Sequence, residues 1–138
     1  MTPSKQERVF KPEYSDELLK IAVGDLGSAE VLLKNFCAEN SRAENIFFLA
    51  QQSIEKSLKA VLCALQLPVP LVHELGVLVS KLPASANPPF GYELTALSEF
   101  AAVRRYEEGA LVLTHEEAVD VVKQARIVYA WAESIVKA

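Results

Sequence analysis

The stretch from about Glu44 to Leu67 constrains the fold of this chain more than any other part of the sequence. On a helical wheel of about 100° per residue, its hydrophilic, bulky apolar and small side chains occupy different faces. Pro68 and Pro70 follow it directly, and proline cannot continue a helix. The stretch therefore predicts one long helix, with a small face on which a neighbouring helix can approach closely.

Two faces of this predicted helix bear on function. The hydrophilic arc spans roughly 140° of the wheel and allows two interpretations. It is either a solvated face with an i, i+4 pair between Glu55 and Lys59, or a polar groove or dimer seam. The small face favours tight packing inside a bundle, with a dimer contact as the alternative. The hydrophilic residues are Gln51, Gln52, Glu55, Lys56 and Lys59, and the small ones are Ala50, Ser53, Ser57, Ala60 and Ala64.

Helical spacing recurs along the rest of the chain. Further helices are expected over residues 16–36, with Ser15 as N-cap, and over residues 72–82 and 92–106. A last helix should begin after Thr114, which forms a capping-box pattern with the glutamate three residues later. Short connections favour antiparallel neighbours. The sequence therefore predicts an all-α, antiparallel up-and-down bundle of four to five helices.

Length and composition limit the possible classes of protein. The 138 residues suit one domain, with residues 1–14 as a flexible N-terminal arm and 15–138 as the bundle. The net charge of -4 excludes a generally basic nucleic-acid-binding surface, so a nucleotide or RNA would need a local basic patch. No apolar run is long enough to span a membrane, and no signal peptide is visible. We expect a cytoplasmic protein without a metal or cofactor, with Cys37 and Cys63 as reduced structural thiols.

Two charged residues interrupt apolar stripes. Asp25 falls on the apolar face of the first predicted helix, and Arg105 continues the apolar face of the fourth. A buried charge is unfavourable unless it is paired and hydrogen-bonded. One interpretation is therefore an ion pair of Asp25 with a cation, for which Arg105, Lys56 and Lys59 are the candidates. The other is that both charges reach water at the edge of the bundle.

Several motifs of the chain resemble those of the HEPN family (higher eukaryotes and prokaryotes nucleotide-binding domain). The segment from Gln51 to Ala60, QQSIEKSLKA, is similar to the family's second-helix hallmark. The segment Ala22 to Leu26 resembles its first-helix pattern, and His73-Glu74-Leu75 resembles its His-Asp-Leu motif. Arg105-Tyr106 resembles the Arg-Tyr-Pro motif that ends the fourth helix. The resemblance covers nearly the whole chain from Ser15 onward.

The resemblance implies a helical bundle that commonly forms homodimers and binds a nucleotide or RNA. Prokaryotic members of this kind are often encoded beside a minimal nucleotidyltransferase, in pairs proposed to act as toxin–antitoxin modules. We therefore expect a binding module that acts with such a partner rather than a self-sufficient enzyme. The expected ligand-binding residues are Gln52, Glu55, Lys56, Lys59, Arg104, Arg105 and Tyr106.

Other members of the family are metal-independent ribonucleases that use an arginine followed, after four to six residues, by a histidine. This chain departs from that pattern, because the next histidine after Arg104 and Arg105 is His115. The alternative hypothesis is a ribonuclease toxin in which Arg105 stabilises the phosphate and His73 is the acid–base. A third possibility is a structural helical adaptor without any ligand.

Overall fold

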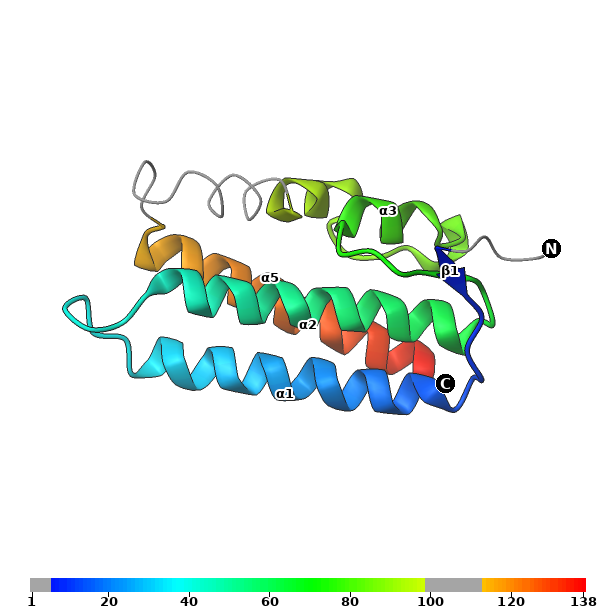
Figure 1. Ribbon diagram of the computed structural model, residues 1–138, viewed down its shortest axis with the longest axis horizontal. Helices are drawn as coiled ribbons and strands as arrows, with labels where there is room; N and C mark the ends of the chain where they lie inside the picture. The colour runs from blue at the N-terminus through cyan, green and yellow to red at the C-terminus, as the bar shows by residue number, and fades with distance from the viewer. Residues whose placement is uncertain (1–5, 99–112) are drawn as a thin grey trace.

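The computed structural model of the chain describes residues 6–98 and 113–138. Its long helices are α1 (Tyr14–Lys34), α2 (Ala43–Ala64) and α5 (His115–Val136). Helix α1 runs antiparallel to α2, whereas α5 runs in the same direction as α2 (Figure 1). Helix α1 is thus antiparallel to both long helices that it contacts, whereas the neighbours α2 and α5 are parallel. The predicted all-α class is confirmed.

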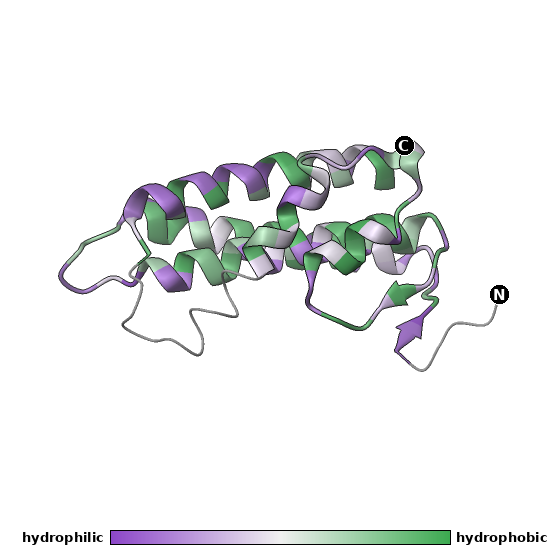
Figure 2. Ribbon diagram, turned by 90° about the horizontal axis from the view of Figure 1, so that it is seen from above, coloured by the Kyte–Doolittle hydropathy of each residue, from purple (hydrophilic) through white to green (hydrophobic). Residues whose placement is uncertain are grey.

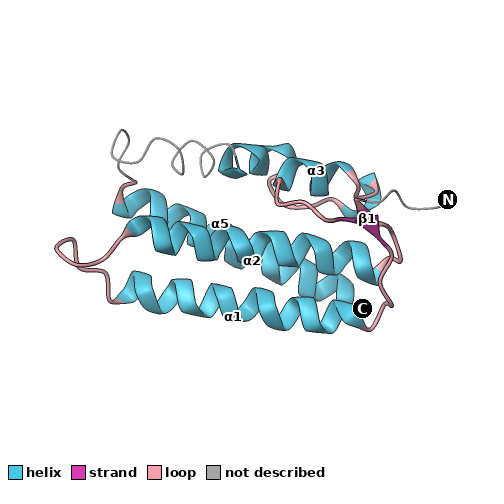
Figure 3. Ribbon diagram, in the orientation of Figure 1, coloured by secondary structure: helices cyan, strands magenta, loops and turns pink. Residues whose placement is uncertain are grey.

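Shorter elements form a layer on the side of α2 opposite to α1 (Figures 1 and 3). The Trp131 indole N–H of α5 donates a hydrogen bond of 2.8 Å to the carbonyl of Ala86, which ties this layer to the long helices. Its helical elements are α3 (Leu75–Ser80), η1 (Ala84–Ala86) and η2 (Gly91–Leu94), and strand β1 (Glu7–Arg8) pairs with β2 (Val69–Pro70).

The core lies between α1, α2 and α5, and hydrophobic residues alternate with hydrophilic ones along each long helix (Figure 2). The small face of α2 packs inside it. Ser53 is fully buried and its hydroxyl donates a hydrogen bond of 2.7 Å to the carbonyl of Ala22 in α1. Tight packing within the bundle, rather than a dimer contact, is thus what this face provides. No helix in the described ranges is both long and apolar enough to cross a membrane.

The start of α1 differs from the prediction. Glu13 is the N-cap residue, and Ser15 already lies in the first turn. The Ser15 hydroxyl donates to the carbonyl of Pro12 at 2.7 Å instead of accepting a bond from a backbone N–H of the helix. A turn leads into the helix, since the backbone N–H groups of Tyr14 and Ser15 bond the carbonyls of Lys11 and Pro12 at 2.9 and 3.1 Å.

Helix α2 ends at Ala64, before the two prolines expected to stop it. Gln66 adopts a left-handed conformation with φ of 59°. The N–H groups of Gln66 and Leu67 bond the carbonyls of Cys63 and Leu62, both at 3.0 Å. This pattern of two bonds is the Schellman motif, which satisfies the last carbonyls of a helix. The helix therefore closes by its own backbone hydrogen bonds.

The elements after α2 are shorter than predicted. Residues 72–74 precede α3 in a non-helical conformation, and the backbone N–H of Leu75 donates a hydrogen bond of 2.9 Å to the Ser98 hydroxyl. The fourth predicted helix begins with the 3-10 turn η2 and continues as α-helix over 95–98. Its remainder lies outside the described residues.

The segment from residue 6 to residue 13 differs from the expected loose arm. Glu7 and Arg8 pair with Pro70 and Val69 in antiparallel register. Further along, the carbonyl of Lys11 accepts a hydrogen bond of 3.2 Å from the thiol of buried Cys63. These backbone contacts hold the start of the described chain against the end of α2. The other cysteine, Cys37, is exposed in the α1–α2 loop.

Helix α5 begins as predicted. The Thr114 hydroxyl accepts a hydrogen bond from the backbone N–H of Glu117 at 3.1 Å, and the Glu117 carboxylate accepts one from the backbone N–H of Thr114 at 3.0 Å. Each side chain thus satisfies a backbone donor that the helix itself leaves free. The acidic residues of this first turn also suit the positive end of the helix dipole.

We expect the Thr114→Ala substitution to lower the free energy of unfolding by about 1 kcal/mol, because the backbone N–H of Glu117 loses its acceptor. Urea denaturation followed by circular dichroism measures this difference. Thr114→Ser is the matched control, since serine retains the hydroxyl and should stay close to the wild type. Equal losses in both variants would show that the cap does not stabilise the helix.

Candidate functional site

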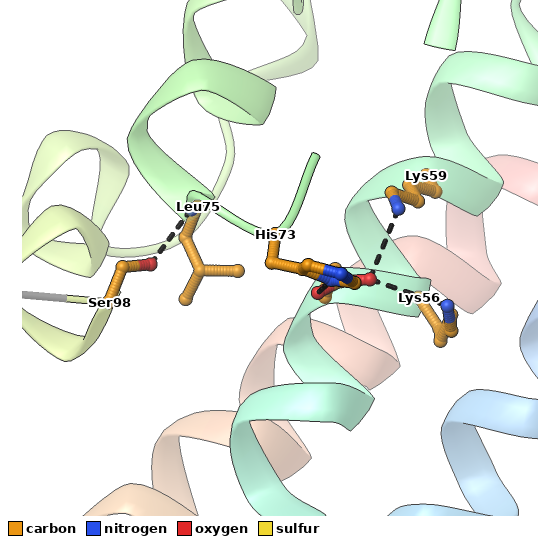
Figure 4. Close-up of polar contacts among 6 residues, drawn as sticks. Lys56, Lys59, His73, Leu75 and Ser98 are labelled. Carbon is orange, nitrogen blue, oxygen red and sulfur yellow. Dashed lines mark hydrogen bonds and ion pairs between the residues drawn. The ribbon is translucent and has the colours of Figure 1, made fainter. Parts of the chain in front are cut away.

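A buried carboxylate in the middle of α2 organises the candidate site. The side chain of Glu55 is 1% exposed, and both of its oxygens accept hydrogen bonds. Oε2 accepts bonds from the ammonium groups of Lys59 at 3.1 Å and Lys56 at 3.3 Å, and Oε1 lies 3.0 Å from Nδ1 of His73 (Figure 4). Three cationic or polar groups from two segments of the chain thus converge on one anion.

The helical period places Lys59 on the same side of α2 as Glu55, whereas Lys56 is the next residue and reaches Glu55 through its long side chain. Lys59 lies one turn beyond Glu55, and its side chain is only 11% exposed. Lys56 is the next residue in sequence, and its side chain is 24% exposed. Both ammonium groups are therefore held in place by a common partner, and Lys56 is the more accessible of the two.

His73 comes from the segment between β2 and α3, 18 residues further along the chain. Because an ionised carboxylate can only accept, the imidazole donates from Nδ1 to Glu55. The side chain of His73 is 80% exposed, so its second nitrogen, Nε2, is accessible from solvent. The hydrogen bond thus orients an exposed imidazole from a buried anchor.

The electrostatic balance at Glu55 favours its ionised form. Burial by itself raises the pKa of this carboxyl. The hydrogen bond from His73 and the charges and hydrogen bonds of Lys59 and Lys56 act against burial and together leave the pKa below the ordinary glutamate value. Glu55 therefore remains an anion at neutral pH, and its two oxygens are occupied as anchors for the three neighbouring groups.

Asp25 borders this cluster from α1. Burial raises the pKa of Asp25, the charge of Lys56 lowers it and the charge of Glu55 raises it, with a net upward shift. The charge of Lys56 thus acts on Asp25, and an ion pair of Asp25 with a cation stays a prediction. The predicted ion pair of Asp25 with Arg105 lies outside the described residues, because Arg105 falls in the range 99–112.

The structure brings together only part of the predicted site. Glu55, Lys56 and Lys59 form one cluster, and Gln52 lies half-buried one turn before Lys56 on α2. His73, named only for the alternative function, joins them through Glu55. Three predicted ligand-binding residues lie outside the described residues: Arg104, Arg105 and Tyr106.

The interpretation of the hydrophilic arc as a solvated face is wrong at its centre. The predicted pair of Glu55 with Lys59 exists, but both residues are buried, and so is Gln51. Position on a wheel could not reveal this, since the bond that completes the cluster comes from His73 beyond the end of α2. The adjacent HEL motif was the one sequence signal that pointed to His73.

Chemically, the cluster offers a ligand hydrogen-bond donors rather than a large net charge. Counting Glu55, Lys56 and Lys59 as ionised leaves a net charge of one positive unit, and an ionised Asp25 at the edge brings the sum to zero. Lys56 is the donor that an approaching ligand can reach. Because Nδ1 of His73 donates to Glu55, the exposed Nε2 accepts a hydrogen bond in the neutral ring and donates one only in the protonated ring. In the described part of the chain, no three histidine, cysteine, aspartate or glutamate side chains gather as metal ligands would.

We expect Glu55→Gln to lower the free energy of unfolding by about 3 kcal/mol at neutral pH, because it leaves two largely buried ammonium groups without their anion. The glutamine keeps the size of the side chain. Glu44→Gln, at a half-buried position in the first turn of α2, is the matched control and should change stability far less. Urea denaturation at constant ionic strength measures both differences.

The same pair of proteins also tests the pKa of Glu55. A carboxyl whose pKa is lowered on folding stabilises the fold at pH values above its pKa in the unfolded chain, here 4.5. This contribution is lost as the pH falls through the lower pKa of the folded state. The difference in stability between wild type and Glu55→Gln should therefore be largest near neutral pH and shrink below about pH 4.5. A difference that grows on acidification would contradict the cluster.

Comparison with known proteins identifies the family. The family model described as HEPN domain matches residues 15–135, which is most of the chain. No curated protein and no solved structure matches this sequence. The matched range begins in the first turn of α1 and ends one residue before the end of α5, so it contains the whole bundle and the Glu55 cluster. The chain belongs to the HEPN family.

Proposed function

We propose that this protein is a binding module that holds a phosphate group of a nucleotide or of RNA on the hydrophilic face of α2. The observation that supports the proposal is the Glu55 carboxylate, which keeps two ammonium groups and an imidazole within 3.3 Å of its oxygens. Family membership supports a nucleotide- or RNA-related role in general terms.

The buried anchor makes the cluster a prepared site. A free lysine side chain loses rotational freedom when it binds a ligand, whereas Lys56 is already held by Glu55 before any ligand arrives. Phosphate oxygens accept charge-assisted hydrogen bonds from ammonium and imidazolium groups. Lys56 and His73 therefore contact the ligand directly in this proposal, while Glu55 and Lys59 position them. Gln52, Arg104, Arg105 and Tyr106 stay proposed contributors to the same site.

The proposed setting is a two-component, toxin–antitoxin-like system with a minimal nucleotidyltransferase, in which two copies of this chain form a homodimer. Membership of the HEPN family supports the setting. The exposed aliphatic side chains on the outer side of α1 support the pairing of two copies, because exposed apolar patches mark interaction surfaces. Co-purification with the product of a neighbouring gene would test the partner.

Calorimetric titration with nucleoside triphosphates and short RNAs tests the binding proposal. We expect Lys56→Ala to weaken binding about tenfold, as loss of one charge-assisted hydrogen bond would. Lys123→Ala is the matched control, since it removes the same charge from an exposed position on α5 and should not alter the affinity. An affinity that is unchanged by Lys56→Ala, or absent at millimolar ligand, would contradict the proposal.

A second candidate function, a metal-independent ribonuclease, is favoured by one specific observation. His73 pairs with a buried carboxylate through Nδ1 and exposes the rest of its ring, as an imidazole that accepts or delivers a proton at Nε2 would. In this alternative, His73 is the acid–base and Arg105 stabilises the charge on the phosphate. Arg105 belongs to the alternative by sequence alone.

The ribonuclease alternative predicts RNA cleavage that persists in EDTA and is lost in His73→Ala. His115→Ala is the matched control, because the ring of His115 lies against Phe36 at the start of α5 and not in the Glu55 cluster. Cleavage that both variants retain would exclude His73 as the acid–base. If neither nucleotide nor RNA binds and only a protein partner does, the structural adaptor is the better description.

A further inference from the structure

The outer side of α1 exposes more apolar surface than its place in a bundle requires. The buried residues of the helix, such as Leu18, Ala22, Leu26 and Ala29, all point towards α2 and α5. On the opposite side, Ile21 is 41% exposed and Val31 is 61% exposed. Helix α1 lies at the edge of the bundle in Figure 1, with no described element beyond it. An aliphatic face of this kind calls for a partner.

Four of the exposed residues follow a coiled-coil spacing, while the exposed Val23 and Leu32 lie beside it. Ile21, Gly24, Ser28 and Val31 are separated by three, four and three residues, which is the a/d pattern of a heptad. The order reads large, small, small, large in both directions along the helix. A face with this symmetry is complementary to itself when a second copy runs antiparallel, because each large side chain then lies opposite another large one.

The glycine of this face is not required by the bundle. A Cβ atom added at Gly24 would meet nothing within 4 Å. Glycine in the interior of a helix lowers its stability relative to alanine, so the fold alone would favour alanine there. Close approach of a partner helix gives Gly24 a physical reason, since a side chain there would hold the two axes apart.

We propose that α1 pairs antiparallel with α1 of a second copy of this chain. In this arrangement, Ile21 of one copy packs on Val31 of the other, and Gly24 lies opposite Ser28 of the other. Each of these layers occurs twice, once on each side of the two-fold axis. The inference rests on the proposed pairing of two copies and names the surface by which they pair.

The charges at the two ends of α1 determine the direction of the pairing. The first turn is acidic, with Asp16 and Glu17, and the last turn is basic, with Lys34. An antiparallel partner brings the acidic turn of one copy to the basic turn of the other, whereas a parallel partner would bring like charges together. On one flank the two Asp25 residues come near each other, and there the charge of Lys56 accompanies each of them.

Site-directed disulfide cross-linking tests both the surface and the direction. Cys37 is exposed and is first replaced by serine, and Cys63 is buried and stays. One chain carries Ile21→Cys and the other, with a size tag, carries Val31→Cys. We expect an oxidised mixture to give the mixed, tagged-to-untagged dimer, and each chain alone to stay uncross-linked. A Val31→Cys chain that cross-links with itself would overturn the antiparallel direction.

The matched control introduces the first cysteine at position 127 instead of position 21. Ile127 is 49% exposed on α5 and lies outside the proposed face. An Ile127→Cys chain should not cross-link to the Val31→Cys chain. Sedimentation equilibrium of the wild type shows whether a dimer forms at all, separately from which surface it uses. A dimer without the Ile21–Val31 cross-link overturns this surface and leaves the pairing intact, and a monomer at all concentrations overturns both.

A second variant tests the close approach without a new thiol. Gly24→Leu adds a side chain where the monomer has space, so the bundle should remain folded by circular dichroism. We expect its dimer dissociation constant to rise at least tenfold in sedimentation equilibrium, because the leucine separates the paired helices. Lys123→Leu, on α5, is the control for added apolar surface. A Gly24→Leu dimer as tight as the wild type would overturn the inference.

Discussion

The Glu55 carboxylate is an anion inside a helical bundle, and a charge in that position is stable only with its partners in place. Two partners belong to the same helix as Glu55: Lys59 lies one turn further on, and Lys56 is the next residue. The third, His73, must be brought from the segment beyond the end of α2. The ion cluster therefore links the long helices to the shorter layer that covers them.

Helix α2 performs this role because its three faces have separate tasks. The small face lets α1 approach, with the hydrogen bond from Ser53 to Ala22 crossing between the two helices. The bulky face, with Ile54, Leu58 and Leu62 fully buried, forms the hydrophobic core. The hydrophilic face is buried at its centre, where Glu55 meets His73 from the segment before α3, and hydrogen bonds between charges gain strength when buried.

Much of the fold could be predicted from the sequence, since it depends on signals within a few residues of each other. The capping box of Thr114 and Glu117 is an example, because both partners lie in one helical turn. The end of α2 was missed by three residues, since nothing in its composition shows that Gln66 takes a left-handed conformation in place of the usual glycine. Ser15 was misassigned because its hydroxyl donates to the carbonyl of Pro12 instead of capping the helix, a choice that residue type alone does not reveal.

The candidate site was predicted less completely, and for a physical reason. Which residues share a face of α2 follows from the helical period, but whether that face is wet depends on the distant segment that covers it. His73 is exposed, yet the residue it contacts is buried, and no local pattern couples the two. Three of the residues expected in the site, Arg104, Arg105 and Tyr106, lie outside the described ranges and stay predictions.

The pairing of β1 with β2 has a bearing on how the protein can be handled and processed. The strand at Glu7–Arg8 lies against Val69–Pro70, only a few residues before His73. A further backbone bond, from the N–H of Leu71 to the carbonyl of Gln6, extends this contact towards the histidine. Proteolytic cleavage or a bulky fusion at the N-terminus would thus loosen the segment after β2 that carries the His73 imidazole, although the two sites are more than sixty residues apart in the sequence.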